Sequence, residues 1–436
     1  MRDLLVVGIV LVGALWALRH PWIGVMLWTW ISIMNPHRYT WSFAYDAPVA
    51  AIAAVATLLG LLFTKERQSP FQGAPTVILF LFAIWVTISW LMGVNVAGDY
   101  AQWDKVMKIY LMTFVALMLL DHKQKIIAFA WVTAGSLAIL GANGGVFTVL
   151  TGGNYRVWGP DFSFIADNNH MALALIMTIP LLHFLQLQLG RAWMRHGMTV
   201  VMLLCAAAAI GTHSRGGFLA IAAMTAFLWW RSRRKFLIGM AILFAVLVLL
   251  PFMPEHWWER MRTIDEYAED PSAMGRINAW IVAWEVAKHN FFGGGMSYQH
   301  QVFFSLYGAH ETIVRAAHSI YFQILGNHGF VGLLLYLLLW IVTYRYAGWL
   351  RKNGRKHPET RWTSDLGAMV QVSLVGFAVG GAFLSMPYFD LPYNMMVMVV
   401  LARRWVESRA WEREAQVDLM EMIGLRRKPA AKATTA

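Results

Sequence analysis

Four short polar motifs interrupt a largely apolar sequence, and each holds residue types that can do chemistry. They are His213-Ser214-Arg215-Gly216-Gly217, Met274-Gly275-Arg276, His318-Ser319 and Pro387-Tyr388-Phe389-Asp390. Arginine carries a planar, permanent positive charge that matches phosphate oxygens. Histidine titrates near neutral pH and can remove a proton from a hydroxyl group. Together these residue types predict a site that holds a phosphate and activates a hydroxyl.

The two arginine motifs contain the predicted phosphate ligands. Arg215 precedes a helix that should start near Gly217, where unpaired N–H groups and the positive dipole end favour an anion. Arg276 stands in the first turn of a predicted amphipathic helix, where a cation opposes the helix dipole unless an anion lies nearby. The structural alternatives are an arginine that reaches up to lipid head groups at position 215 and a solvated charge at position 276.

His318 and Asp390 are the candidate catalytic residues. His318 stands before a long apolar stretch, and as a general base it would contribute about 10²–10⁴ in rate. Asp390 could orient His318 or contact a sugar hydroxyl. The alternatives are a polar histidine satisfied at a helix end and an aspartate that only forms a turn. Gly329 and Gly332 follow His318, and they should let another helix approach closely without any chemical part.

The elements that must position these residues are membrane helices. Of the 436 residues, 58% are hydrophobic and 14% charged, against roughly 45–50% and 25% in soluble proteins. Twelve apolar stretches predict an all-α polytopic membrane protein with about twelve transmembrane helices. They cover approximately residues 4–34, 46–63, 74–92, 104–120, 126–150, 168–188, 198–212, 217–230, 236–252, 318–344, 366–386 and 388–402. The one cysteine, Cys205, excludes an intramolecular disulfide and a cysteine-based metal site.

The distribution of basic residues predicts the topology. If residues 4–34 cross the membrane once from a cytoplasmic N-terminus, 25 of the 36 Lys and Arg residues lie on the cytoplasmic side, as the positive-inside rule requires. This reading also accounts for the net charge of +12 without nucleic acid. Both termini are then cytoplasmic. The external cations include Arg156 and Arg315, which are candidates for a secondary role in substrate binding.

This topology divides the chain into four parts. They are an N-terminal transmembrane region at 1–252 with helices 1 to 9, an external loop at 253–317, transmembrane helices 10 to 12 at 318–405 and a cytoplasmic tail at 406–436. The loop should carry an amphipathic surface helix at 274–288, with Trp280 and Trp284 as interfacial anchors. Whether residues 4–34 form one segment or two stays open, because Arg19, His20 and Pro21 interrupt them.

The set of motifs resembles the bacterial O-antigen ligases. His318-Ser319 is followed by nine intervening residues and then by Gly329-Phe330-Val331-Gly332, which is similar to the signature histidine that follows the large periplasmic loop of that family. The motifs around Arg215, Arg276 and Asp390 occupy places similar to the family's other functional positions. The N-terminal region, with Asn35-Pro36-His37-Arg38, is similar to a subgroup labelled O-glycosylation ligases.

The resemblance implies a GT-C-like glycosyltransferase of the bacterial inner membrane. It would move a glycan from undecaprenyl pyrophosphate to a sugar hydroxyl of lipid A-core at the periplasmic face. Arg215 and Arg276 would hold the pyrophosphate, His318 would act as general base and Asp390 would support it. Direct attack would invert the anomeric centre, and the arginines would replace a metal, so neither a metal nor another cofactor is expected. The partners would be the lipid-linked donor, the lipid A-core acceptor and membrane lipids.

Other functions stay open at this stage. The wider superfamily includes O-antigen polymerases and protein O-oligosaccharyltransferases, which differ in the acceptor. From another class, a lipid or polysaccharide transporter would also need about twelve helices and arginines for phosphate. A transporter should carry ionisable residues near the middle of the membrane. Here the candidate residues cluster at the predicted outer ends of the helices, which favours chemistry.

Overall fold

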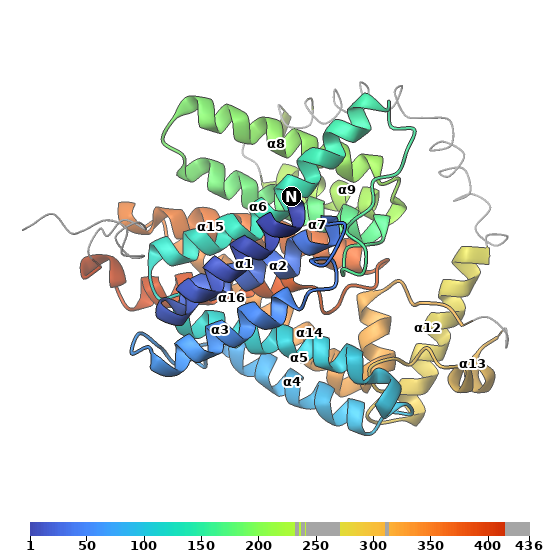
Figure 1. Cartoon of the computed structure of the whole chain (residues 1–436). Coiled ribbons are helices and arrows are strands. Elements are labelled where there is room, and N and C mark those ends of the chain that lie inside the picture. Colours follow the sequence, from blue (N-terminus) through green and yellow to red (C-terminus); the bar gives the residue numbers. More distant parts are fainter. Residues whose placement is uncertain (232–234, 237–239, 241–270, 310–313, 415–436) are drawn as a thin grey trace, which may run out of the picture.

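The computed structural model describes residues 1–231, 235–236, 240, 271–309 and 314–414 (Figure 1). Within these ranges every regular element is a helix, which confirms the all-α class there. The elements are α1 (Arg2–Arg19), α2 (Pro21–Met34), η1 (Pro36–Tyr39), α3 (Val49–Phe63), α4 (Ala74–Leu91), α5 (Val96–Leu119), α6 (Lys123–Leu150), α7 (Asn168–Gln188), α8 (Ala192–Gly211), α9 (Arg215–Arg231), α12 (Pro271–His289), α13 (Gln301–Tyr307), α14 (Ile320–Asn353), η3 (Pro358–Thr360), α15 (Arg361–Gly381), α16 (Asp390–Glu407) and η4 (Ala410–Glu412).

Six of these segments are long and apolar enough to cross a bilayer. They are α4, α6, α7, α8, α14 and the segment Pro358–Gly381, which joins η3 to α15. Helices α2 and α3 are shorter but equally apolar. The chain is therefore a helical membrane protein, while the count of about twelve crossings stays a prediction. Most of the predicted stretch 236–252, part of the predicted loop at 253–270 and the tail beyond 414 lie outside the described residues.

The helices run between two ends of one bundle. We call the end at which α7, α9 and α14 begin the site end, and the end at which α16 finishes the tail end. At the tail end the backbone N–H of Gln68 donates to the Met118 carbonyl. Arg404 of α16 also binds Gln68 there. In Figure 1 the tail end faces left. Every candidate residue named from the sequence lies at the site end.

The first apolar stretch, residues 4–34, is two helices and not one. Helix α1 ends at Arg19, α2 begins at Pro21, and only His20 separates them. The two helices fold back on each other, since a Cβ atom on Gly13 would lie 3.1 Å from the Leu27 side chain. Proline explains the break, because it has no N–H to continue α1 and its fixed φ suits the first position of a new helix.

The hairpin corrects the predicted position of the N-terminus. The Asp3 carboxylate accepts hydrogen bonds from the backbone N–H groups of Ser42 and Ala44, which follow α2. Helix α1 therefore begins at the site end, whereas α16 finishes at the tail end. The expectation that both termini share one side assumed a single crossing by residues 4–34, and the break at His20 removes that assumption. The number of basic residues assigned to the tail end is unchanged, because Arg2 now lies at the site end and Arg19 lies at the tail end.

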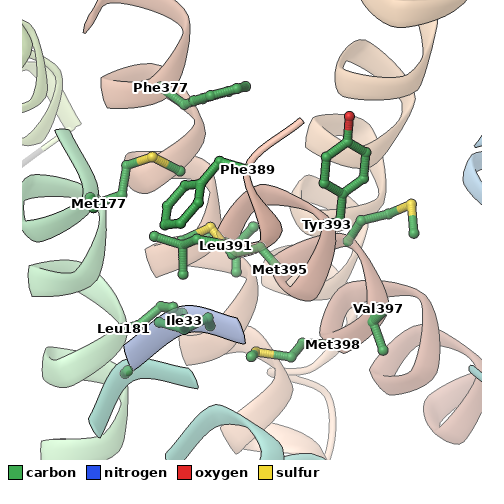
Figure 2. Close-up of a cluster of buried hydrophobic side chains, with 14 of the residues drawn as sticks. Ile33, Met177, Leu181, Phe377, Phe389, Leu391, Tyr393, Met395, Val397 and Met398 are labelled. Atoms are coloured by element: carbon green, nitrogen blue, oxygen red, sulfur yellow. The ribbon is translucent and has the colours of Figure 1, made fainter. Parts of the chain in front are cut away.

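Helix α16 forms the centre of the core. Its side chains from Asp390 to Ala402 are almost all buried, as expected of a helix surrounded by others on every side. Figure 2 shows side chains of α2, α7 and α15 meeting α16 and the residue that precedes it. The residues labelled there are Ile33, Met177, Leu181, Phe377, Phe389, Leu391, Tyr393, Met395, Val397 and Met398. This packing buries the start of α16 at the site end, and Asp390 with it.

Helix α14 is broken at Gly329. Its φ of 66° and ψ of −171° are not helical, and a Cβ atom there would lie 2.4 Å from the Phe291 carbonyl oxygen. Gly332 has the predicted role, because a Cβ atom on it would lie 3.2 Å from the Trp85 side chain of α4. His328, the residue directly before Gly329, is buried. Its two ring nitrogens contact the hydroxyl groups of Ser89 and Tyr388. The break divides α14 into a short part that follows His318 and a long part that starts after Gly329.

Candidate active site

Two histidine-serine pairs share one backbone arrangement at the site end. His213 has a φ of 55° and His318 a φ of 44°, both in the left-handed region that residues other than glycine rarely adopt. In each pair a serine follows, and a helix then begins, α9 after Ser214 and α14 after Ser319. The Ser214 hydroxyl accepts a hydrogen bond from the Gly217 N–H at 3.0 Å and so caps α9.

The start of α9, with Arg215, rests on the first turn of α7. The side-chain amide of Asn168 donates to the Thr212 carbonyl at 2.7 Å. A Cβ atom on Gly217 would lie 2.8 Å from the Cβ of Ala172. Gly217 therefore allows the two helices to approach closely. Arg215 is half-buried at this contact, beside two helix N-termini that both favour negative charge.

His318 lies among charges from its own segment and from two others. Its partial burial, the most important cause, and the positive charges of Arg276 and Arg315 lower its pKa below the ordinary value of 6.5, while Asp167 opposes this shift. Its Nδ1 atom is buried and makes no hydrogen bond to any described part of the chain. The imidazole is therefore neutral at neutral pH and has a ring nitrogen available for a proton. Arg276 thus lies within electrostatic range of His318, and a shared site for the two residues stays a prediction.

Helix α12 carries Arg276 and is hydrogen-bonded to Ala317, the residue before His318. Its bounds, Pro271–His289, contain the predicted helix at 274–288. The indole N–H of Trp280 donates to the Ala317 carbonyl at 2.6 Å, and its ring stacks on Phe322 with centroids 4.9 Å apart. Trp280 is thus a packing residue and not the interfacial anchor that was expected, whereas Trp284 is 47% exposed. The Arg315 side chain lies against Gly275, where a Cβ atom would be 3.2 Å from Arg315 Cγ.

Asp167 and His170 are site residues that the sequence analysis missed. Asp167 caps α7 by accepting a hydrogen bond from the Asn169 N–H at 2.9 Å, and its charge acts on His318. His170 lies within electrostatic range of both Asp167 and His318, and its buried Nε2 has no hydrogen-bond partner among the described residues. The run Asp167-Asn168-Asn169-His170 before an apolar stretch was the available signal, but it also reads as an ordinary helix cap.

Asp390 lies in a different polar cluster at the same end of the bundle. It is only 4% exposed, and its Oδ1 accepts a hydrogen bond from the Ser32 hydroxyl at 2.6 Å. Lys105 of α5 is the cation in electrostatic range of it. The charges acting on His318 include Asp167 but not Asp390. Neither Ser32 nor Lys105 could be recognised from the sequence, because both lie in predicted membrane segments far from Asp390 in the chain.

Arg156 is placed apart from the residues around His318. It lines a separate cavity together with Arg2 and residues of α1, η1 and α6. Of the two secondary candidates, Arg315 therefore lies beside His318 and Gly275, while Arg156 belongs to another part of the site end.

Comparison with known families identifies the chain. Residues 200–337 match the O-antigen ligase family. This part of the protein is an O-antigen ligase domain. Residues 1–189 match a second family, described as a family of unknown function (DUF5935). No curated protein matches the chain. An O-antigen ligase domain in a chain with apolar helices long enough to span a membrane indicates an enzyme of ligase-type or polymerase-type glycosyl transfer.

The two family matches meet at the candidate site of this O-antigen ligase. Arg215, Arg276 and His318 fall within the O-antigen ligase match at 200–337, whereas Asp167 belongs to the N-terminal match at 1–189. The site therefore combines both regions of the chain, because the first turn of α7 supplies the carboxylate that acts on His318.

Proposed function

We propose that this O-antigen ligase transfers a glycan from undecaprenyl pyrophosphate to a sugar hydroxyl of lipid A-core at the periplasmic face of the inner membrane. The observation that carries the proposal is the neutral, half-buried imidazole of His318 set beside Arg276 and Arg315. This combination supplies a base and positive charge side by side. Transfer from a pyrophosphate needs both, since the acceptor hydroxyl loses a proton while the leaving group gains negative charge.

Arg215 and Arg276 hold the pyrophosphate of the donor in this mechanism. Each guanidinium presents a planar fork to phosphate oxygens, and a charge-assisted hydrogen bond contributes about 1.5–3 kcal/mol. The first turn of α9 adds backbone N–H groups and the positive end of its dipole. Because pyrophosphate is already a good leaving group, the main task of the two arginines is to stabilise charge as the glycosidic bond breaks.

His318 removes the proton from the acceptor hydroxyl. The oxygen attacks the anomeric carbon, the bond from that carbon to the pyrophosphate oxygen breaks, and its electron pair leaves with the pyrophosphate. One direct displacement inverts the anomeric centre. Asp167 stabilises the imidazolium that forms, and Asp390 has a supporting role from its buried position at the start of α16. The arginines supply the positive charge, so the scheme uses neither a metal nor a cofactor.

Single-turnover transfer with the full-length protein in nanodiscs tests the proposal. The substrates are undecaprenyl-pyrophosphate-linked glycan and lipid A-core. We expect His318→Ala to lower the rate by about 10²–10⁴ without loss of donor binding, while His20→Ala, at the tail end of the α1–α2 hairpin, retains wild-type activity. Arg215→Lys keeps the charge and loses the fork, so we expect weaker donor binding. Wild-type rates for His318→Ala would exclude the base, and wild-type binding for Arg215→Lys would exclude the fork.

The products of the same reaction distinguish the alternative functions. Glycan attached to lipid A-core supports the ligase. Longer lipid-linked glycans identify a polymerase, and glycan on serine or threonine identifies a protein O-oligosaccharyltransferase. Movement of intact donor across the membrane without release of undecaprenyl pyrophosphate would identify a transporter and contradict the enzyme.

A further inference from the structure

A second cavity opens at the site end, away from His318. Its volume is about 640 Å³, within the range of ordinary ligand pockets. Helix α1 forms one wall with Leu5 and Ile9, and α6 forms another with Asn143 and Phe147. Pro36 and Tyr39 of η1 lie between them, and the segment that holds Arg156 closes the end. The Asn35-Pro36-His37-Arg38 motif thus has a structural place beside this cavity.

The lining combines an apolar body with two cations. Most of the residues around the cavity are aliphatic or aromatic, and the charged ones are Arg2 and Arg156, with no acidic side chain among them. Among the described residues neither arginine forms an ion pair, and the Arg2 guanidinium lies over the face of Trp41, at 6.0 Å from the ring centroid. A positively charged head on an apolar groove matches an amphiphile that carries a negative head group.

The cavity faces the bilayer. Leu5 is 64% exposed and Ile9 44% exposed on α1, and Phe147 of α6 is exposed beside them. These apolar side chains belong to helices of a membrane protein, so the surroundings that reach them are lipid chains. A ligand can therefore enter sideways from the membrane, with its acyl chains along the helices and its head group at the level of the arginines.

We propose that this cavity binds one anionic phospholipid from the surrounding bilayer. The phosphate lies between Arg2 and Arg156, and the first methylene groups of the acyl chains pack against Leu5, Ile9 and Phe147. Two cations and no carboxylate in the lining favour an anionic head group over a neutral one, since basic residues near the membrane surface attract anionic lipid.

A lipid bound in this cavity would also stabilise the candidate active site. The Val157 N–H donates to the Gly211 carbonyl at 3.0 Å, and His213 Nε2 donates to the Gly153 carbonyl at 2.8 Å. The wall that holds Arg156 is thus bonded to the turn that precedes Arg215. From this link we expect anionic lipid to increase transfer activity. That consequence rests on the proposed function, whereas the binding itself does not.

Native mass spectrometry of the full-length protein released from nanodiscs tests the binding. The nanodiscs contain equal amounts of phosphatidylcholine and phosphatidylglycerol. We expect the wild type to retain one phosphatidylglycerol. The double variant Arg2→Gln/Arg156→Gln should retain roughly tenfold less, while Arg19→Gln, which removes a charge from the other end of α1, should behave as wild type. Retention by the double variant equal to that of Arg19→Gln would overturn the proposal.

Two further measurements separate the cavity from general attraction of lipid to positive charge. Leu5→Trp fills the cavity and leaves both arginines in place, so it should also lose the retained lipid; undiminished retention would show that the lipid binds elsewhere. Undecaprenyl phosphate added at the concentration of phosphatidylglycerol should not displace it, and efficient displacement would assign the cavity to the donor and contradict a phospholipid site. Unchanged thermal unfolding midpoints show that each variant is folded, whatever its activity.

Discussion

At the scale of single residues, the candidate site depends on how charges act on His318. Burial alone makes the charged imidazole less stable, and Arg276 and Arg315 add repulsion, while Asp167 partly offsets both. The same arginine that binds the donor therefore also keeps the base neutral. Because the neutral imidazole is the active form, activity should fall only when the pH drops through a pKa below 6.5.

The first prediction concerns this electrostatic coupling. Arg276→Gln removes a positive charge that lowers the pKa of His318, so that pKa should rise. The acidic limb of the pH profile for kcat/KM should then move to higher pH, in addition to the loss of rate from weaker donor binding. Lys288→Gln is the matched control, since Lys288 lies in the last turn of the same helix and pairs with Glu285. An unmoved limb, or one moved to lower pH, would contradict the coupling.

At the scale of elements, short breaks between helices set the geometry of the site. His213 and His318 adopt left-handed backbones directly before α9 and α14, and Gly329 interrupts α14 eleven residues after His318. Strained backbone of this kind persists only where the surrounding packing holds it. The first turn of α7, the cap of α9 and Trp280 of α12 provide that packing around the two histidines.

The second prediction concerns the break in α14. Gly329→Ala places a Cβ atom at a positive φ and 2.4 Å from the Phe291 carbonyl oxygen. We expect a loss of about 1–3 kcal/mol in the free energy of unfolding and a lower melting temperature in detergent. Gly135→Ala in the interior of α6 is the control, because nothing lies within 4 Å of its Cβ position and alanine is the better helix former. Equal melting temperatures for the two variants would show that the break tolerates a side chain.

At the scale of the whole molecule, the break at His20 decides which ends of the chain share a side. Helix α1 begins at the site end through the bonds of Asp3 to Ser42 and Ala44. Arg404 of α16 reaches Gln68 at the tail end. The positive-inside count favours a cytoplasmic tail end. The start of α1 is then on the same side as the candidate site.

The third prediction concerns this topology. Peptide tags fused to the two termini should respond oppositely to a protease added to spheroplasts. We expect cleavage of the N-terminal tag and protection of the C-terminal tag until the membrane is opened. A single cysteine at Asn154, introduced into a Cys205→Ala background, reports the site end and should react with an impermeant thiol reagent from outside. Protection of both tags would restore the single crossing by residues 4–34.

The sequence by itself determined the class of the protein and predicted that the candidate residues share one end of the helices. Apolar stretches long enough to span a bilayer predict the helices, because an α-helix satisfies its backbone hydrogen bonds within one segment in lipid. The asymmetry of basic residues placed Arg215, Arg276, His318 and Asp390 at one end of the bundle. These properties are local, since each depends on composition over one helix or one loop.

Only the tertiary structure decided which of those residues meet. Asp167 acts on His318 across about 150 residues of sequence, and Asp390 bonds Ser32 at the start of the chain instead. The α1–α2 hairpin likewise depends on contacts with α3, where a Cβ atom on Gly60 would lie 2.3 Å from the Ala17 carbonyl oxygen. Charge interactions and close helix contacts depend on distance in space, and helix packing sets that distance, so neither could be read from local composition.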